Sequence, residues 1–186
     1  MKKKFLLFLL AILTSTNIFS TNGFNSDCEV KIGDLYYFLY RNDRIAEVAP
    51  EDGYGFSNYV GLKTATIPST ITYNDTVYNV IGISAGTFYW SGDLSSVTIP
   101  NSVTHIGAQA FSHCTNLKSV RIPDGVTHIY SNTFSGSGIT SITIPTQIDS
   151  IGSCAFFECD SLTTVVWNAR KAVGDDDGLG TIDALL

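Results

Sequence analysis

Residues 94–116 read LSSVTIPNSVTHIGAQAFSHCTN, and the next two stretches of the chain repeat the same pattern. Residues 117–138 read LKSVRIPDGVTHIYSNTFSGSG, and residues 139–161 read ITSITIPTQIDSIGSCAFFECDS. The first and third units are equal in length, the second is slightly shorter, and residues 162–167 (LTTVVW) begin another copy. Self-similarity at such a fixed period is the signature of a repeat architecture, in which each unit stacks on its neighbours. The sequence therefore predicts a solenoid.

A further copy begins at Leu62 and is split by an insert. Residues 62–68 (LKTATIP) match the start of the repeat, and residues 80–88 (VIGISAGTF) match its middle. Between them, short apolar-polar runs flank Asn74 and Asp75, a pair typical of the two-residue turn of a β-hairpin. The predicted solenoid covers residues 62–170, with units that start at residues 62, 94, 117, 139 and 162.

Apolar residues recur at equivalent places in every unit. The clearest columns are Leu94, Leu117, Ile139 and Leu162; Val97, Val120, Ile142 and Val165; Ile99, Ile122 and Ile144; and Phe88, Phe111, Phe134 and Phe156. One unit cannot bury such a face alone, so the columns are expected to form the core between stacked units.

Each unit is expected to contain one short strand. Val97 and Ile99 point inward and Thr98 outward, and Pro100, which lacks an N–H, ends the strand. Successive strands are expected to pair in parallel, about 4.8 Å apart. For residues 107–114, a short helical turn and an irregular coil both fit. The expected fold is thus mainly β, with short irregular or helical turns.

The units resemble the BspA-like leucine-rich-repeat family of bacterial surface antigens. The shared motif is L-x-x-V-x-I-P-x-x-V-x-x-I-x-x-x-A-F-x-x-C-x-x-L, carried best by residues 94–117 and 139–162. The middle unit departs from it, since Thr133 replaces Ala110, Ser137 replaces Cys114, and one position is missing. The resemblance implies a secreted or cell-surface protein that mediates protein–protein interaction or adhesion without catalysis.

The first residues have the order of a secretory signal peptide. Lys2, Lys3 and Lys4 precede an unbroken apolar run at residues 5–13, and small polar residues follow as far as Gly23. The apolar run is too short to span a bilayer, which takes about 20 residues. We assign residues 1–23 to the signal peptide, and no later stretch has the character of a transmembrane helix.

The net charge of the chain limits the classes of partner that it is expected to bind. Without the three lysines, 8 basic residues stand against 17 acidic ones, a net charge near −9. Such a chain is a poor candidate for binding nucleic acid or anionic lipid. Of the chain, 44% is hydrophobic and only 15% is charged, which argues against disorder.

Both ends differ from the repeats. In the N-terminal lead, residues 24–61, a β-hairpin is expected from residues 35–40 (LYYFLY) and 45–49, and it would cap the first unit. Its tyrosines offer an alternative role as a recognition surface: Tyr36, Tyr37, Tyr40, Tyr54 and Tyr59.

The C-terminal tail, residues 171–186, is acidic and contains GDDDGLGTIDALL. It resembles the opening of a dockerin-type calcium loop, in which Asp175, Asp177 and Asp183 would be the ligands. Leu179 and Leu186 stand where further acidic ligands are required, so a decayed loop or a solvated tail is the preferred interpretation, and no metal site or cofactor is expected.

Histidine and cysteine positions do not indicate an active site. His105 and His128 share a column in which the next unit has Ser150, so a solvated pair is favoured over a metal site. His113 and Cys114 are adjacent in sequence and lack an orienting third group, so a Cys–His nucleophile is rejected. No catalytic or phosphate-binding motif occurs.

The four cysteines are expected to remain free. Cys114 and Cys159 lie two units apart, at about 10 Å, whereas a disulfide needs Cα atoms within about 7 Å. A local bond between Cys154 and Cys159 stays open, and Cys28 has no predicted partner. Burial as free thiols is the default.

The remaining feature is a polar ladder on the outer side of the strands. Its predicted members are Thr66, Thr98, Arg121 and Thr143, with Ser96, Ser119 and Ser141 in the flanking row. We interpret this face as the binding surface for a protein partner, a host matrix or cell-envelope protein, because Arg121 has interface character. The alternative is a structural spacer or display stalk within a larger surface assembly.

Overall fold

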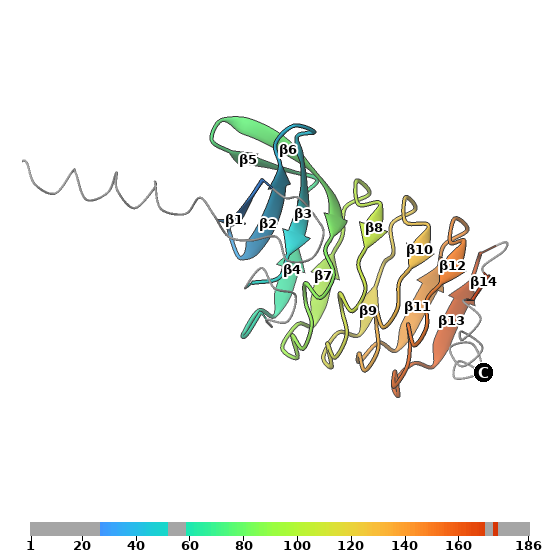
Figure 1. The fold of residues 1–186 in the computed structure, drawn as a ribbon. Helices are drawn as coiled ribbons and strands as arrows, with labels where there is room; N and C mark the ends of the chain where they lie inside the picture. The colour runs from blue at the N-terminus through green and yellow to red at the C-terminus, as the bar shows by residue number, and fades with distance from the viewer. Residues whose placement is uncertain (1–26, 52–58, 170–172, 175–186) are drawn as a thin grey trace, which may run out of the picture.

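The computed structural model describes residues 27–51, 59–169 and 173–174, and every regular element within them is a β-strand. Two rows of short parallel strands run along the repeats (Figure 1). The first row contains β4 (Thr64–Thr66), β7 (Ser96–Thr98), β9 (Ser119–Val120), β11 (Ser141–Ile144) and β13 (Thr164–Trp167). The second row contains β6 (Thr76–Ile83), β8 (His105–Ile106), β10 (His128–Ile129), β12 (Ser150–Ile151) and β14 (Val173–Gly174). The predicted solenoid of mainly β character is confirmed.

The register of the first row matches the predicted alignment of the units. Ser141 of β11 lies opposite Ser119 of β9 on one side and Thr164 of β13 on the other, all in parallel. Thr64 of β4 likewise lies opposite Ser96 of β7. Apart from the start of β6, the second row was not predicted, because the two-residue strands β8, β10, β12 and β14 are too short to show an alternating pattern in the sequence.

The segment between the two rows corresponds to residues 107–114, for which the sequence allowed a short helical turn or an irregular coil. It forms a series of turns and not a helix. Each turn is held to the turn of the next unit by backbone hydrogen bonds. Phe88 N donates to Ala110 O at 2.8 Å, and Phe111 N donates to Thr133 O at 2.9 Å. The turns therefore continue the backbone pairing around the third side of each coil.

The phenylalanine column forms a stack through the centre of the turns. Ring centroids of Phe88 and Phe111 are 5.4 Å apart, those of Phe111 and Phe134 are 5.6 Å apart, and those of Phe134 and Phe156 are 5.5 Å apart. Leucine or isoleucine at the start of the units is fully buried beside the stack, as at Leu94, Leu117 and Ile139. Burial of these columns between units is the main stabilising contribution to the fold.

The N-terminal cap is larger than the predicted hairpin. The hairpin itself is confirmed as antiparallel β2 (Leu35–Tyr40) and β3 (Ile45–Ala49), and β1 (Cys28–Ile32) adds a strand that the sequence did not predict. β3 pairs in parallel with β6, and β6 pairs in parallel with β8, so the cap forms one six-stranded sheet with the first two strands of the second row.

The insert within the first unit is the predicted hairpin. β5 (Thr70–Tyr73) and β6 pair antiparallel around Asn74 and Asp75, whose φ angles of 46° and 58° are those of a type I′ turn. Asparagine and aspartate tolerate this left-handed backbone better than most residues.

Tyr59 ties the cap to the first coil. Its hydroxyl donates to Ala49 O at 2.6 Å and accepts from Tyr36 N at 3.0 Å, while its own N–H donates to Ser91 Oγ at 3.1 Å. Tyr37 and Tyr59 are buried, with 2% and 4% of their surface exposed, so the alternative that they form a recognition surface is wrong. Tyr54 lies outside the described residues.

The predicted signal peptide, residues 1–23, also lies outside the described residues. So does the predicted tail, residues 171–186, apart from Val173 and Gly174, which leaves out the candidate calcium ligands Asp175, Asp177 and Asp183. In the part of the chain that the structure describes, no helix has the length and hydropathy required to cross a bilayer.

Candidate binding face

The polar ladder arises from alternation along the first-row strands. In β11, Ile142 and Ile144 are buried, whereas Ser141 and Thr143 are exposed on the opposite side. β4 follows the same rule, with Thr64 and Thr66 exposed around buried Ala65. All the residues predicted to line the face are exposed: Thr66, Thr98, Arg121, Thr143, Ser96, Ser119 and Ser141. The pleat of each strand thus delivers its small polar residues to one surface.

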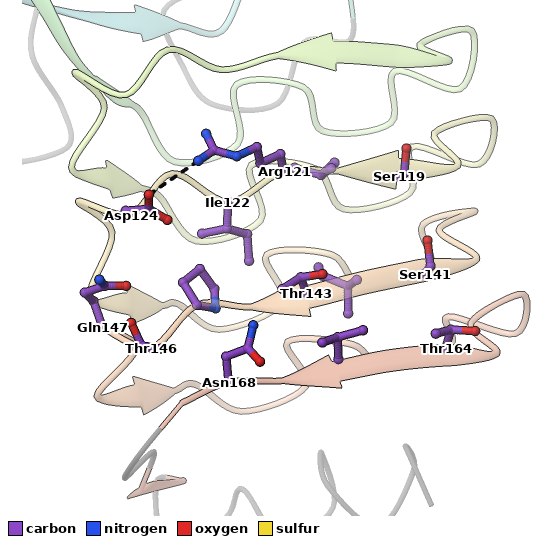
Figure 2. Close-up of a pocket in the computed structure, with 14 residues that line it drawn as sticks. Ser119, Arg121, Ile122, Asp124, Ser141, Thr143, Thr146, Gln147, Thr164 and Asn168 are labelled. Carbon is purple, nitrogen blue, oxygen red and sulfur yellow. Dashed lines mark hydrogen bonds and ion pairs between the residues drawn. The ribbon is translucent and has the colours of Figure 1, made fainter.

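Part of this face is hollowed into an open groove of about 670 Å³ that crosses β9, β11 and β13 (Figure 2). Four of the predicted residues line it: Ser119, Arg121, Ser141 and Thr143. The other three, Thr66, Ser96 and Thr98, lie on β4 and β7 and do not line the groove. The face is therefore hollowed over the later units, and Thr66 lines a second, smaller hollow of about 330 Å³ between β4 and the cap.

One wall of the groove comes from residues that sequence reasoning did not single out. Asp124, Thr146, Gln147 and Asn168 follow the strands, and Figure 2 shows them beyond the strand ends, on the side of the second row. After β9 and β11 a proline turns the chain, so Asp124, Thr146 and Gln147 behind it are placed beside the groove. Their fixed offset after Ile-Pro is the signal that could have found them, whereas Asn168 takes the place of the proline after β13.

Among the described residues, Arg121 is the one cationic side chain that lines the groove. Its Nη1 donates to Asn101 Oδ1 at 2.8 Å, and its Nη2 lies 3.4 Å from Asp124 Oδ2. The side chains of Arg121 and Asp124 are 63% and 68% exposed, so their ion pair contributes little to stability. Its consequence is to orient the guanidinium, which retains further donors for a ligand.

A second polar cluster joins the cap to the second row. Glu47 of β3 and His105 of β8 pair with the same strand, β6, and their side chains meet across it, with His105 Nε2 3.2 Å from Glu47 Oε1. Gly82 lies between them, where a Cβ would be 2.0 Å from the imidazole ring. The absence of a side chain at Gly82 therefore permits the contact.

Glu47 is buried, and its carboxylate is satisfied by hydrogen bonds. Ser84 Oγ donates to Glu47 Oε2 at 2.6 Å. Burial alone would raise the pKa of Glu47, but the hydrogen bonds from His105 and Ser84 and the charge of His105 together hold the pKa below its usual value. The carboxylate is thus kept ionised inside the junction.

The predicted solvated histidine pair is correct for one member only. His128 is exposed and stacks with Tyr130, with ring centroids 6.2 Å apart. His105 is instead half-buried and engaged by Glu47, because the cap supplies a carboxylate that the repeat pattern does not reveal. Among the described residues, no three potential ligands are grouped as a metal site would need.

The cysteines take structural positions in the coils. The Sγ atoms of Cys114 and Cys159 donate to Phe88 O and Phe134 O, each at 3.0 Å, in the preceding unit. All four cysteines are free, so Cys154 and Cys159 do not form the local bond that the sequence left open. Serine takes the place of cysteine in the middle unit, as Ser137.

These environments predict different thiol reactivities. Burial raises the pKa of Cys114 to about 12, so its thiolate is scarce near neutral pH, whereas Cys154 is exposed. With iodoacetamide at about pH 8, we expect rapid modification of Cys154 and none of Cys114 in the folded protein. Peptide mass spectrometry measures both sites, and the unfolded chain serves as the control in which both react. Equal rates in the folded protein would contradict the buried position of Cys114.

The repeats identify the family. Residues 81–173, half of the chain, match the BspA type leucine-rich-repeat region in six copies. The protein belongs to this family of leucine-rich-repeat proteins, as its motif predicted. No curated protein is significantly similar to the chain.

Solved structures share the fold. A leucine-rich-repeat protein from Bacteroides capillosus has 25% identity and a TM-score of 0.62, over 75% of this chain and 97% of that one. Another, from Bacteroides ovatus, has 26% identity and a TM-score of 0.58, over 74% of this chain and 40% of that one.

The pneumococcal vaccine antigen PcpA has 22% identity and a TM-score of 0.59, over 78% of this chain and 40% of that one, and this likeness concerns the fold alone. The chain thus spans less than half the length of two of these three proteins.

Proposed function

We propose that the protein is an exported or cell-surface binding module that contacts a protein partner through the groove over β9, β11 and β13. The observation that carries the proposal is the gathering of Ser119, Arg121, Ser141 and Thr143 around one hollow. The order of residues 1–23 supports export. Membership of a family of binding repeats supports a non-catalytic role.

The chemistry of the groove suits a polar polypeptide surface. Short hydroxyl side chains offer donors and acceptors with little side-chain entropy to lose, and Arg121 adds a guanidinium that is already oriented by Asn101 and Asp124. Ile122 and Pro145 add apolar area to the lining. Interfaces commonly combine an arginine anchor with such mixed surroundings.

The test is capture of partners from a mixture of extracellular-matrix and cell-envelope proteins by the chain from residue 24 onward. Combined replacement Arg121→Ala and Thr143→Ala is expected to weaken capture at least about tenfold, because truncation of an interface anchor commonly costs more than about 1 kcal/mol. The matched control is Thr66→Ala with Thr98→Ala, which alters the same ladder outside the groove and should leave capture unchanged.

Circular dichroism and thermal unfolding must show that both variants fold. Equal capture by the groove variant and the parent would mean that the groove is not the binding site. Absence of any captured protein would instead favour the role of a spacer or display stalk.

A further inference from the structure

The cap extends only one of the two strand rows. β1, β2 and β3 continue the sheet of the second row beyond β6, whereas the first row begins at β4 (Figure 1). In the described part of the chain, β4 pairs with β7 and with no other strand. An edge strand of this kind presents backbone N–H and C=O groups with which a further strand can pair.

The backbone groups on the open edge of β4 belong to Thr64 and Thr66. Ile67 N donates to Thr98 O at 3.0 Å, toward β7. Backbone groups alternate between the two edges of a strand, so those of Ala65 and Ile67 face β7, and those of Thr64 and Thr66 face the opposite way. The open edge therefore offers N–H and C=O groups in the spacing that a parallel strand requires.

The smaller hollow, of about 330 Å³, lies beside this edge, between β4 and the turn that joins β1 to β2. Leu35 and Tyr37 of β2 line it, together with Leu62 and Ala65 of the first unit. Asp34 is exposed and is the one charged side chain among the described residues that line this hollow. The hollow thus combines apolar surface with a carboxylate.

The inward columns of the first row are less complete at this end. Ala65 occupies the position of Val97 and Val120 in the next two units. Val97 is half-buried, whereas Val120 has only 5% of its surface exposed. Leu62, at the start of the first unit, is also half-buried, although Leu94 has no exposed surface. An apolar side chain placed beside Ala65 would cover surface of the kind that the next units bury.

We propose that β4 binds an extended segment of a partner protein as an additional parallel strand, hydrogen-bonded to Thr64 and Thr66. An aliphatic side chain of the segment packs on Leu62 and Ala65 in the smaller hollow, and a basic side chain pairs with Asp34. In this mode of recognition, backbone hydrogen bonds supply affinity and side-chain pockets supply specificity. The site is separate from the groove over β9, β11 and β13, so it does not depend on the function proposed for that groove.

Hydrogen exchange of the free protein, followed by NMR, tests whether the edge is open. The amides of Thr64 and Thr66 are expected to exchange at least about tenfold faster than those of Ala65 and Ile67, which face β7. Protection of Thr64 and Thr66 at every protein concentration would mean that another part of the chain already covers the edge. Protection that is lost on dilution would mean that a second copy is the occupant. Either result would overturn the proposal.

The probe for binding is a synthetic peptide with the sequence of residues 117–123, LKSVRIP, which has the alternation of a first-row strand and two basic residues. We expect the peptide to slow exchange at Thr64 and Thr66 and to leave exchange at Ala65 unchanged. Asp34→Asn is expected to weaken binding of the peptide, and the loss should disappear at high salt.

Methylation of the peptide nitrogens distinguishes strand pairing from other modes of contact. With Val120 of the peptide opposite Ala65, the N–H groups of Val120 and Ile122 in the peptide face β4. Methylation of these two nitrogens is expected to weaken binding at least about tenfold, because edge hydrogen bonds are lost. The matched control is methylation at Ser119 and Arg121 of the peptide, whose N–H groups face away, and it should leave binding unchanged.

Variants of the protein test the same hydrogen bonds from the other side. Thr66→Pro removes one N–H from the open edge, where proline is tolerated, so binding is expected to fall at least about tenfold in a folded protein. Thr66→Ala keeps the N–H and should bind the peptide as the parent does. The groove variant, Arg121→Ala with Thr143→Ala, should also bind it unchanged, which separates this site from the groove.

Two results with the peptide would overturn the proposal. One is unchanged exchange at Thr64 and Thr66 with the peptide at about 1 mM, where even weak binding is detected. The other is an equal effect of the two methylation patterns, which would mean that the peptide does not bind as a strand. The methylated peptides need no change in the protein, so they decide the matter even if Thr66→Pro fails to fold.

Discussion

Replacement of Phe111 by alanine is expected to lower the free energy of unfolding by about 3–5 kcal/mol, the range for deletion of a buried aromatic ring. Phe111 has no exposed surface, and its ring lies between those of Phe88 and Phe134 in the stack. Its removal leaves a cavity at the centre of the repeats and breaks the stack into two parts. Urea unfolding followed by circular dichroism measures the change.

Tyr130→Ala provides the matched control for Phe111→Ala. Tyr130 is an aromatic residue of the next coil, but 46% of its surface is exposed. Its replacement should change stability by no more than about 0.5 kcal/mol, as is usual for surface positions. A cost below about 1 kcal/mol for Phe111→Ala would mean that neighbouring units collapse into the space, and that the stack is not the main support of the solenoid.

Replacement of His105 by alanine is expected to cost about 1.5–3 kcal/mol, the range for a hydrogen bond to a charged group. The loss removes one of the donors that stabilise the buried carboxylate of Glu47, which keeps the hydrogen bond from Ser84 Oγ. Because the His105 side chain is 32% exposed, water can partly replace it, and we expect the lower part of that range. Urea unfolding at neutral pH measures the effect.

His128→Ala is the control, because His128 occupies the same column in the next unit but is exposed and does not face a carboxylate in the described residues. We expect a change within about 0.5 kcal/mol. Equal costs for the two histidine variants would mean that the contact between His105 and Glu47 does not stabilise the junction of cap and solenoid.

The contact between Glu47 and His105 is expected to make the stability of the fold depend on pH. The pKa of Glu47 is lower in the folded protein than in the unfolded chain, where it is about 4.3. A lowered pKa stabilises the fold above the unfolded value, and this stability is lost as the pH falls through the folded value. In urea unfolding from pH 7 down to about 3, the parent should therefore lose more stability than Glu47→Gln, which lacks the titrating group.

The architecture could be derived from the sequence because the repeat is local. Each apolar column recurs once per unit, and each Ile-Pro pair marks the end of a strand, so unit length, strand position and parallel register all follow from one unit. The hairpin around Asn74 and Asp75 was predictable for the same reason, since its turn chemistry lies within two adjacent positions. The same alternation placed the polar ladder on one face.

What the repeat could not supply are contacts between segments with different patterns. Glu47 belongs to the cap and His105 to a repeat, and only the pairing of both β3 and β8 with β6, with Gly82 between, brings their side chains together. The burial of Tyr59, and hence its role as a structural anchor, depends in the same way on Ala49 and Ser91.

The groove, too, was predictable from the sequence only in part. The sequence by itself determined which residues point outward, because alternation along a strand is a local property. Only the tertiary structure decided that the larger groove lies over β9, β11 and β13 and that a smaller hollow lies beside β4, because the depth of a groove depends on how the neighbouring turns and strands pack. The depth of the groove is set by the stacking of whole coils, and a single unit does not encode that stacking.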